Sequence, residues 1–345
     1  MPDNTKQSEN RVPKQRRIAV IGLGKMGVLH AGILNSLPAV RVKAICEKDS
    51  RLTELAKKLL PNSVAFYKDH MKMIATEDVD AVFITTPIES HVPMATDVAR
   101  ARPEIGLFVE KPLGSSGVEA LEACEVAERS GCIHMVGYQK RFSPIFQHAR
   151  KLILEQVVGE LMFFRAQFFS SDVLHGGKTW RFRKGKGGVI LDLAPHLIDL
   201  LLWLFGDVDS VHTIKRRLFS NDVEDYVHTA FSFKSGLSGH MDVCWSVQGY
   251  RLPELLIEAQ GKNGRLSVTD DFIKVEKNEG GDHLSSRTLY KQSFETSVPI
   301  LLADPDFTRE DEQFLKCLDT RSLPDSNFRE AAKVNAIMDK MIEIH

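Results

Sequence analysis

The first third of the chain alternates short apolar runs with longer amphipathic segments. The runs are rich in β-branched residues, and the segments between them repeat their apolar positions with the period of a helix. This alternation is typical of parallel strands joined by crossover helices. We therefore predict a doubly wound parallel sheet of the α/β class, with strands at residues 17–22, 41–46, 63–67, 81–85, 106–110 and 133–137.

The pattern changes after Arg141. A helix is predicted over residues 144–155, and the later apolar runs alternate with polar positions between turns rich in Asn, Gly and Pro. Such runs predict an α+β domain with a large, open and mostly antiparallel sheet. Its strands are expected within residues 160–170, 209–219, 225–234, 237–247 and 254–261, and helices follow at 309–318 and 327–344.

These patterns divide the chain into three parts. Residues 1–16 are expected to form a disordered tail rather than a signal peptide, because no apolar run follows their charges. Residues 17–140 form the predicted parallel domain, and residues 141–345 form the α+β domain. The last helix of the α+β domain is free to pack back on the parallel domain. No apolar run is long enough to cross a bilayer, so we expect a soluble, cytoplasmic protein with no membrane partner.

Composition narrows the classes of partner. Lysine and arginine number 45 against 46 acidic residues, so no basic field predicts binding to nucleic acid. The five cysteines are scattered without a CxxC pair, which indicates reduced thiols and predicts no metal site. A small molecule is the expected partner.

A glycine motif follows the first predicted strand directly and heads a predicted helix. Glycines in the pattern GxGxxG allow a tight turn, close approach of the backbone to a pyrophosphate and packing of helix on strand, while the helix N-terminus attracts the phosphate charge. The motif therefore predicts a dinucleotide site. Its expected loop contacts are Gly22, Leu23, Gly24, Lys25, Met26 and Gly27.

The end of the second predicted strand indicates which dinucleotide binds. Glu47 stands where a carboxylate can accept hydrogen bonds from the ribose hydroxyls and repel a 2′-phosphate, so NAD is favoured over NADP. NADP stays open because Lys48 and Arg51 lie close by and could receive that phosphate. In the alternative interpretation Glu47 is only a solvated loop residue.

Two further strand ends carry candidate cofactor contacts, because ligands of doubly wound sheets bind beyond the carboxyl ends of the strands. Lys111 is expected to direct its ammonium group at the nicotinamide and the substrate oxygen, with Pro112 restraining the backbone. The alternative interpretation of Lys111 is a surface ion pair with Glu110. For His91 the alternative is a packing role at a helix end. The expected contacts at these strand ends are Thr85, Thr86, Pro87, His91, Glu110 and Lys111.

The apolar stretch GGVILDLAPHLIDLLLWLFG, at residues 187–206, carries Asp192, His196 and Asp199. An unpaired buried carboxylate costs several kcal/mol, so a helix that serves packing alone would have leucine there. The three residues are spaced to form one polar stripe on a helix that begins near Pro195. The stripe predicts a polar ligand; the alternative is a buried hydrogen-bonded network that only joins the domains.

The motifs together resemble a known family. The chain is similar to the Gfo/Idh/MocA oxidoreductases in the order and spacing of GLGKMG at 22–27, TTP at 85–87, EKP at 110–112, VGYQKRFSP at 136–144 and GGVILDLAPHLIDLL at 187–201. The resemblance implies a Rossmann domain, a second domain whose open sheet forms the interface of a homodimer or homotetramer, and oxidation or reduction of a ring hydroxyl in a sugar, cyclitol or derivative.

The resemblance also implies roles for single residues. The lysine of the EKP motif is Lys111, and the acid and base of the DxxxH motif are Asp192 and His196. An imidazole of ordinary pKa near ~6.5 can accept and return a proton at neutral pH, so His196 is the expected general acid and base. Two departures are Pro195, where many members have glycine, and Gln139, where many have asparagine.

The substrate contacts are expected to come from the loop TWRFRKGKGG. Trp180 offers a flat face to a ring, and Arg181 and its basic neighbours Arg183, Lys184 and Lys186 could meet an anionic group. The alternative is a solvated basic loop. The expected substrate-binding residues are Lys111, Arg141, Trp180, Arg181, Asp192 and His196.

Two other functions stay open. The resembled family contains glycosidases that use bound NAD without net redox change, and members that bind dinucleotide as regulators without turnover. Retention of Lys111, Asp192 and His196 together favours a dehydrogenase, because a pure binding module needs none of them.

Overall fold

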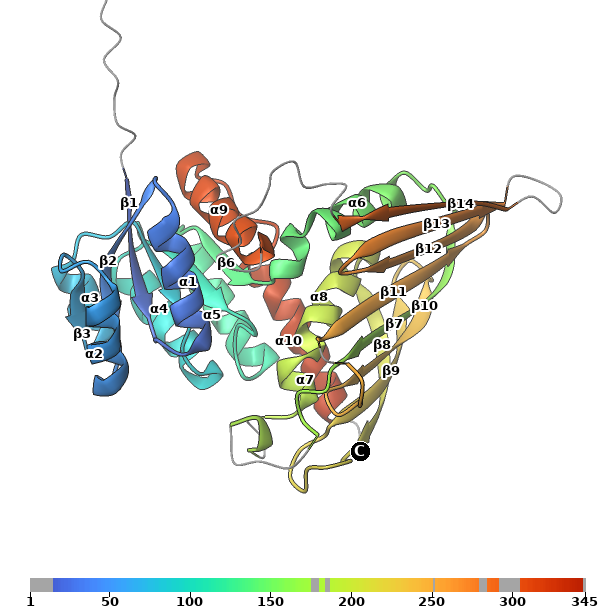
Figure 1. The fold of residues 1–345 in the computed structure, drawn as a ribbon, viewed down its shortest axis with the longest axis horizontal. Helices are drawn as coiled ribbons and strands as arrows, with labels where there is room; N and C mark the ends of the chain where they lie inside the picture. Colours follow the sequence, from blue (N-terminus) through green and yellow to red (C-terminus); the bar gives the residue numbers. More distant parts are fainter. Residues whose placement is uncertain are drawn as a thin grey trace, which may run out of the picture.

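The protein is described by a computed structural model that covers residues 15–174, 180–183, 187–250, 252–278, 284–291 and 305–343. The first domain is a six-stranded parallel sheet in the order β3-β2-β1-β4-β5-β6 (Figure 1). The order confirms the predicted Rossmann sheet. Its strands are β1 (Arg16–Ile21), β2 (Val40–Cys46), β3 (Ala65–Tyr67), β4 (Ala81–Ile84), β5 (Gly106–Glu110) and β6 (His134–Gly137).

The strands form because helices cover both faces of the sheet, so that nearly continuous apolar runs can be buried. Every residue of β4, β5 and β6 is buried. Side chains cap several helices: Asp49 accepts a hydrogen bond from the Arg51 N–H, and Ser116 accepts one from the Glu119 N–H. The helices are α1 (Lys25–Ser36), α2 (Ser50–Leu59), α3 (His70–Thr76), α4 (His91–Ala101) and α5 (Gly117–Ser130).

The first strand begins one residue earlier than predicted. Arg16, which was assigned to the disordered tail, lies in β1, because its N–H donates to the Ala39 carbonyl oxygen at 2.8 Å. Its guanidinium group also binds Asp319 of the C-terminal part of the chain. These contacts extend the strand toward the N-terminus.

The second domain is an eight-stranded sheet in the order β14-β13-β12-β11-β7-β10-β9-β8. Only β7 and β10 pair in parallel among its described strands, which confirms a mostly antiparallel sheet. The prediction had no separate strands for β12 to β14. The strands are β7 (Leu161–Phe169), β8 (Val208–Arg216), β9 (Tyr226–Phe233), β10 (Ser238–Cys244), β11 (Glu254–Gly261), β12 (Gly264–Thr269), β13 (Phe272–Asn278) and β14 (Leu284–Tyr290).

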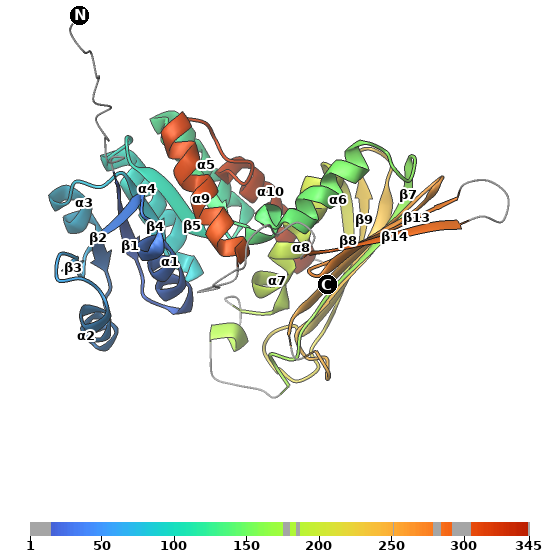
Figure 2. The ribbon, with the colours of Figure 1, turned by 45° about the horizontal axis from the view of Figure 1, so that its top comes forward.

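Helices fill the space between the two sheets (Figure 2). Three of them, α6 (Pro144–Leu154), α7 (Val189–Asp192) and α8 (Ala194–Phe205), follow the first domain along the chain and lie against the large sheet. Two more, α9 (Pro305–Thr320) and α10 (Phe328–Glu343), close the chain and pack on the parallel domain. None of the helices in the described part of the chain is long and apolar enough to cross a membrane.

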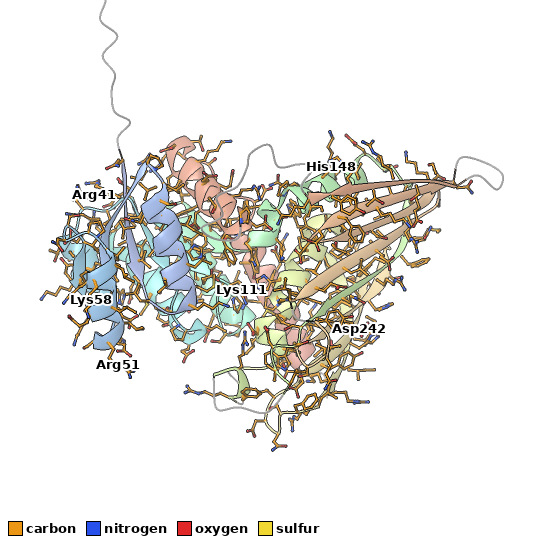
Figure 3. The ribbon with its side chains drawn as sticks, viewed as in Figure 1. Arg41, Arg51, Lys58, Lys111, His148 and Asp242 are labelled. Atoms are coloured by element: carbon orange, nitrogen blue, oxygen red, sulfur yellow. The ribbon has the colours of Figure 1, made fainter. Side chains whose placement is uncertain are left out.

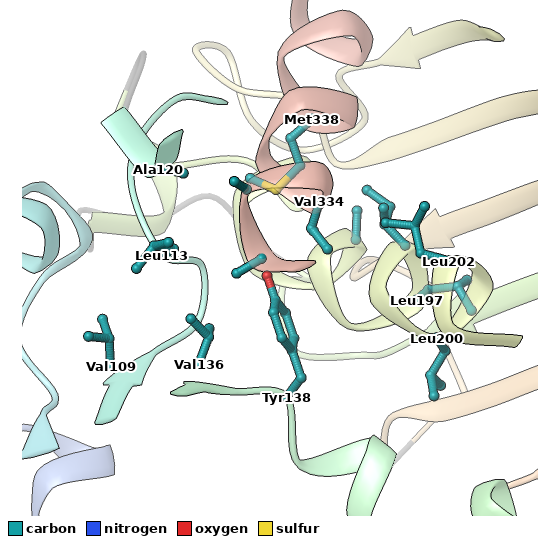
Figure 4. Packing of buried hydrophobic residues seen from close by; sticks show 14 of the residues in the cluster. Val109, Leu113, Ala120, Val136, Tyr138, Leu197, Leu200, Leu202, Val334 and Met338 are labelled. Carbon is teal, nitrogen blue, oxygen red and sulfur yellow. The ribbon is translucent and has the colours of Figure 1, made fainter. Parts of the chain in front are cut away.

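One apolar core joins the domains. The Asn335 amide on α10 donates to the Gly114 carbonyl oxygen at 2.6 Å, and the Gly117 N–H at the start of α5 donates to Asp339 at 2.7 Å. In Figure 4 the side chain of Tyr138 lies between α10 and the strands of the first domain. The shared core fixes α7 and α8 relative to the carboxyl edge of the parallel sheet.

Candidate active site

The glycine loop between β1 and α1 is folded too tightly for larger side chains. Gly22 has a φ of +93°, which favours glycine, and a Cβ atom on Gly27 would lie 1.9 Å from the Gly22 carbonyl oxygen. The Thr85 hydroxyl group donates to that same oxygen at 2.9 Å and ties the loop to the end of β4. The loop is therefore shaped by contacts with its own backbone and with β4.

The start of α1 fits the pyrophosphate of a dinucleotide. A Cβ atom on Gly24 would meet no atom of the described residues within 4 Å, so these residues leave open space in front of it. Gly24 is the N-cap of α1 and has no side chain to cap the helix, and the first turn holds no acidic residue. Free N–H groups at a helix N-terminus bind phosphate oxygens. Gly24, Lys25 and Met26 would hold the pyrophosphate there.

Glu47 is integrated into the loop structure rather than left in solvent. One carboxylate oxygen accepts a hydrogen bond from the Leu23 N–H at 2.6 Å, and the other accepts one from the Asp49 N–H at 2.7 Å. Arg51, which could have received a 2′-phosphate, is paired with Asp49 instead. The carboxylate of Glu47 therefore lies beside the glycine loop, where adenosine ribose hydroxyls would approach.

The EKP turn directs Lys111 toward the second domain (Figure 3). The Lys111 ammonium group lies 2.8 Å from the carbonyl oxygen of Asp192 and 3.4 Å from its carboxylate. The other carboxylate oxygen of Asp192 lies 2.9 Å from Arg181. The alternative of a surface ion pair between Lys111 and Glu110 is therefore wrong. The peptide bond between Lys111 and Pro112 is cis. Two cations share one nearly buried carboxylate at the junction of the domains.

His196, the expected general acid and base, is buried on α8. Burial, together with the charges of Lys111 and Lys140, lowers the pKa of His196 well below the ordinary 6.5. The ring is therefore neutral at physiological pH, and its Nδ1 atom is buried with no hydrogen-bond partner among the described residues. A neutral imidazole next to fixed positive charge can accept a proton from a ligand and return it.

Comparison with known proteins assigns both domains. Residues 16–138 match the family described as oxidoreductase family, NAD-binding Rossmann fold, and residues 146–267 match the GFO/IDH/MocA C-terminal domain. The chain belongs to the Gfo/Idh/MocA oxidoreductases. Its first domain is an NAD-binding Rossmann domain, and the predicted cofactor, NAD, is confirmed at the level of the family.

Relatives and solved structures extend this likeness over most of the chain. The scyllo-inositol 2-dehydrogenase (NAD(+)) of Bacillus subtilis (strain 168) is 30% identical over 66% of this chain and 67% of its own length. The D-apiose dehydrogenase of Paraburkholderia graminis is 23% identical over 94% of this chain and 86% of its own length. Levoglucosan dehydrogenase in complex with NADH and levoglucosan shares the fold, with a TM-score of 0.86 at 23% identity over 96% of this chain and 97% of that chain.

The predicted polar stripe of this Gfo/Idh/MocA protein is interrupted. Helix α7 ends at Asp192 and α8 begins at Ala194, so Asp192 does not share one continuous helix with His196 and Asp199. Pro195 lies in the first turn of α8, where its missing N–H costs least. The break at this point separates Asp192 from the helix that carries His196 and Asp199.

Arg141 is held in a buried ion pair, which disfavours the predicted substrate contact. Its guanidinium group binds both carboxylate oxygens of Asp199, at 2.6 and 2.7 Å, and the carbonyl oxygen of Asp325 at 2.9 Å. The side chains of Arg141 and Asp199 are 2% and 1% exposed. For Asp199 the structure favours the alternative of a buried hydrogen-bonded network, because its carboxylate pairs with Arg141; both residues belong to the second domain.

Two predicted cofactor contacts also have structural partners. The ring nitrogens of His91 lie 2.9 Å from the Pro112 carbonyl oxygen and 2.7 Å from that of Thr86, so His91 ties the TTP loop to the EKP turn from behind. Glu110 is buried and faces His30 at 2.9 Å. The structure favours the packing role for His91 and assigns Glu110 to a buried network.

The basic loop is described only in part. Arg181 pairs with Asp192 and is one third exposed. The side chain of Trp180, together with Lys184 and Lys186, lies outside the described residues, and Arg183 is exposed. Sequence reasoning missed Lys140, whose ammonium group pairs with Asp270 and whose charge acts on His196. Its place in the VGYQKRFSP motif was the available signal.

Proposed function

We propose that this Gfo/Idh/MocA protein oxidises or reduces a secondary hydroxyl group of a sugar, a cyclitol or a derivative of either, with NAD as the hydride carrier. The observation that carries the proposal is the pair of groups at the junction of the domains: the buried Nδ1 atom of His196 has no hydrogen-bond partner among the described residues, and the Lys111 ammonium group lies 2.8 Å from the Asp192 carbonyl oxygen. Relatives named as dehydrogenases of scyllo-inositol, D-apiose and levoglucosan support the choice of substrate class.

His196 and Lys111 divide the work of removing hydrogen from the substrate carbinol. His196 accepts the hydroxyl proton, and the ammonium group of Lys111 stabilises the negative charge that develops on the oxygen. Asp192 binds both Lys111 and Arg181, so it keeps the two cations at the reacting group. NAD, when bound, supplies the acceptor for the hydride that leaves the carbon bearing this hydroxyl group.

The charge of Lys140 should set the acid limb of the oxidation reaction. Oxidation needs neutral His196, so activity is lost as the pH falls through the pKa of this residue. The positive charge of Lys140 disfavours the imidazolium form of His196, so the pKa of His196 rises when this charge is removed. In Lys140→Met the acid limb of kcat/KM should therefore move to higher pH than in the wild type, while Lys140→Arg, which keeps the charge, should not shift it. Superimposable profiles for Lys140→Met and the wild type would contradict this role.

Substrate screening tests the proposed function directly. NADH formation is followed with cyclitols, free sugars, sugar acids and nucleotide sugars, with NAD and NADP run in parallel. Turnover with one class of ring supports the dehydrogenase and identifies the substrate. Tight NAD binding without oxidation of any alcohol would refute it and favour the redox-neutral glycosidase or the regulator.

We also propose that the protein forms a homodimer or homotetramer through the outer face of its large sheet. Phe163 on β7 and Ile214 on β8 are 54% and 52% exposed in the single chain, and contact with a second copy of the sheet would bury them. Light scattering coupled to gel filtration tests this proposal, and a monomer at all concentrations would overturn it.

A further inference from the structure

A fully buried histidine lies in the second turn of α1, outside the residues that the mechanism uses. One ring nitrogen of His30 lies 2.9 Å from Oε1 of Glu110, and the other lies 2.9 and 3.1 Å from the two carboxylate oxygens of Asp311. The rings of Phe83 and Phe108 lie 5.6 and 5.0 Å from the imidazole. The ring is thus held between two carboxylates and packed against aromatic side chains.

The contacts of His30 join three elements that carry the site. His30 belongs to α1, whose N-terminus is the expected pyrophosphate site, and Asp311 belongs to α9. Glu110 ends β5, and its second carboxylate oxygen accepts a hydrogen bond from the N–H of Lys111 at 3.1 Å. A continuous chain of hydrogen bonds therefore runs from α9 through His30 and Glu110 to the backbone of Lys111.

The charge of the cluster indicates that it is more than packing. Both ring nitrogens of His30 face carboxylates, so both donate a hydrogen bond. Burial disfavours the charged ring and lowers its pKa. The charges and hydrogen bonds of Asp311 and Glu110 outweigh this effect and raise the pKa of His30 well above its usual range. Apolar side chains of similar volume would often be at least as stable as such a buried ion network. A network retained at that cost is expected to fix a geometry.

A buried carboxyl group next to the network completes the cluster. Both oxygens of Glu310 are buried without a hydrogen-bond partner among the described residues, and burial together with Glu110 raises the pKa of Glu310 well above its usual range. His30, Glu310 and Asp311 also place three potential metal ligands within 4.8 Å of one another. Both nitrogens of His30 already face carboxylates at hydrogen-bond distance, so the geometry favours a hydrogen-bonded link over a metal site.

We propose that His30 is a positioning residue: through Glu110 and Asp311 it fixes α1, which faces the dinucleotide phosphates, against the strand end that carries Lys111. The proposal rests on the part that Lys111 has in the proposed function. Loss of the link should let the phosphate site and Lys111 move relative to each other, and a small misplacement far from the reacting atoms can cost on the order of 10²-fold in rate.

Titration of the protein with NADH, followed by nicotinamide fluorescence, tests the link without any substrate. His30→Leu fills the aromatic cage but removes both hydrogen bonds, and we expect its Kd for NADH to rise about tenfold or more. A core variant on the opposite face of the parallel sheet, Val98→Ala or Ile74→Ala, is chosen to match its loss in Tm. Asp311→Asn keeps one acceptor for the ring of His30, so this variant should keep most of the wild-type affinity for NADH.

The outcomes separate this proposal from its alternatives. A Kd that rises no more in His30→Leu than in the matched core variant would overturn the positioning role. If His30→Leu does not fold, Glu110→Gln, which keeps the size of the side chain but offers only one acceptor, takes its place with the same expectation. Metal bound in equal molar amount to the purified protein and lost in Glu310→Gln would also overturn it. A wild type that binds NADH tightly but oxidises no alcohol would refute the proposed function and leave the link intact.

Discussion

Replacing His196 with alanine should lower turnover by on the order of 10²- to 10⁴-fold, the usual contribution of a positioned general base. The reason is that His196 is the proposed proton acceptor, while it lies on α8 of the second domain and not on the Rossmann domain that carries the glycine loop. The Kd for NADH should therefore stay close to that of the wild type. Steady-state kinetics with the identified substrate and a fluorescence titration with NADH measure the two quantities separately.

A second histidine provides the control for this experiment. His148 lies on α6, far from Lys111 in Figure 3, and His148→Ala should keep wild-type turnover. Equal turnover in His196→Ala and the wild type would exclude His196 as the base. A loss of NADH affinity as large as the loss of turnover would instead mean that the variant has disturbed the cleft.

The parallel domain could be predicted from local sequence because its strands are buried on both faces. Such strands appear as unbroken apolar runs, and all six lie within a few residues of the predicted positions. Strand β13 shows why others were missed: only Ile273 of its residues is buried, and the others are polar or half-buried. A strand near the edge of an open sheet loses the alternation that makes it visible in a sequence.

The site could be predicted only as far as its motifs extend. Lys111, Asp192 and His196 came from motifs, and the structure brings the first two into contact. Arg141 and Asp199 are 58 positions apart, and no local pattern shows that they pair with each other instead of meeting a ligand. Polarity within an apolar run thus indicates a partner, but the sequence alone does not show whether the partner is a ligand or another side chain.

The same limit applies to the network around His30. Asp311 lies 281 positions after His30, so their contact depends on α9 packing against α1. The sequence motif GLGKMG indicated the cofactor loop, but it did not extend to the histidine three residues beyond Gly27. Long-range ion pairs of this kind hold the motif residues in place, and they become visible only when the chain is folded.

Replacing Gly27 with alanine should open the cofactor loop. The new Cβ atom would lie 1.9 Å from the Gly22 carbonyl oxygen and 2.8 Å from the Thr85 hydroxyl group, and a backbone atom cannot yield without moving the loop. Overpacking of this kind costs about 1–3 kcal/mol in the free energy of unfolding. If a similar free energy is lost from binding, the Kd for NADH rises by up to about 10²-fold.

A glycine on the same helix gives the matched control for Gly27→Ala. A Cβ atom on Gly32 would meet no atom within 4 Å in the part of the chain that the structure describes. Gly32→Ala should therefore fold at least as well as the wild type, since alanine favours a helix by about 1 kcal/mol over glycine. It should also bind NADH normally. Thermal unfolding and NADH titration of both variants decide the matter: normal affinity in Gly27→Ala would mean that the loop adapts to a side chain at this position, and the tight packing between Gly22 and Gly27 would then not be what shapes the cofactor site.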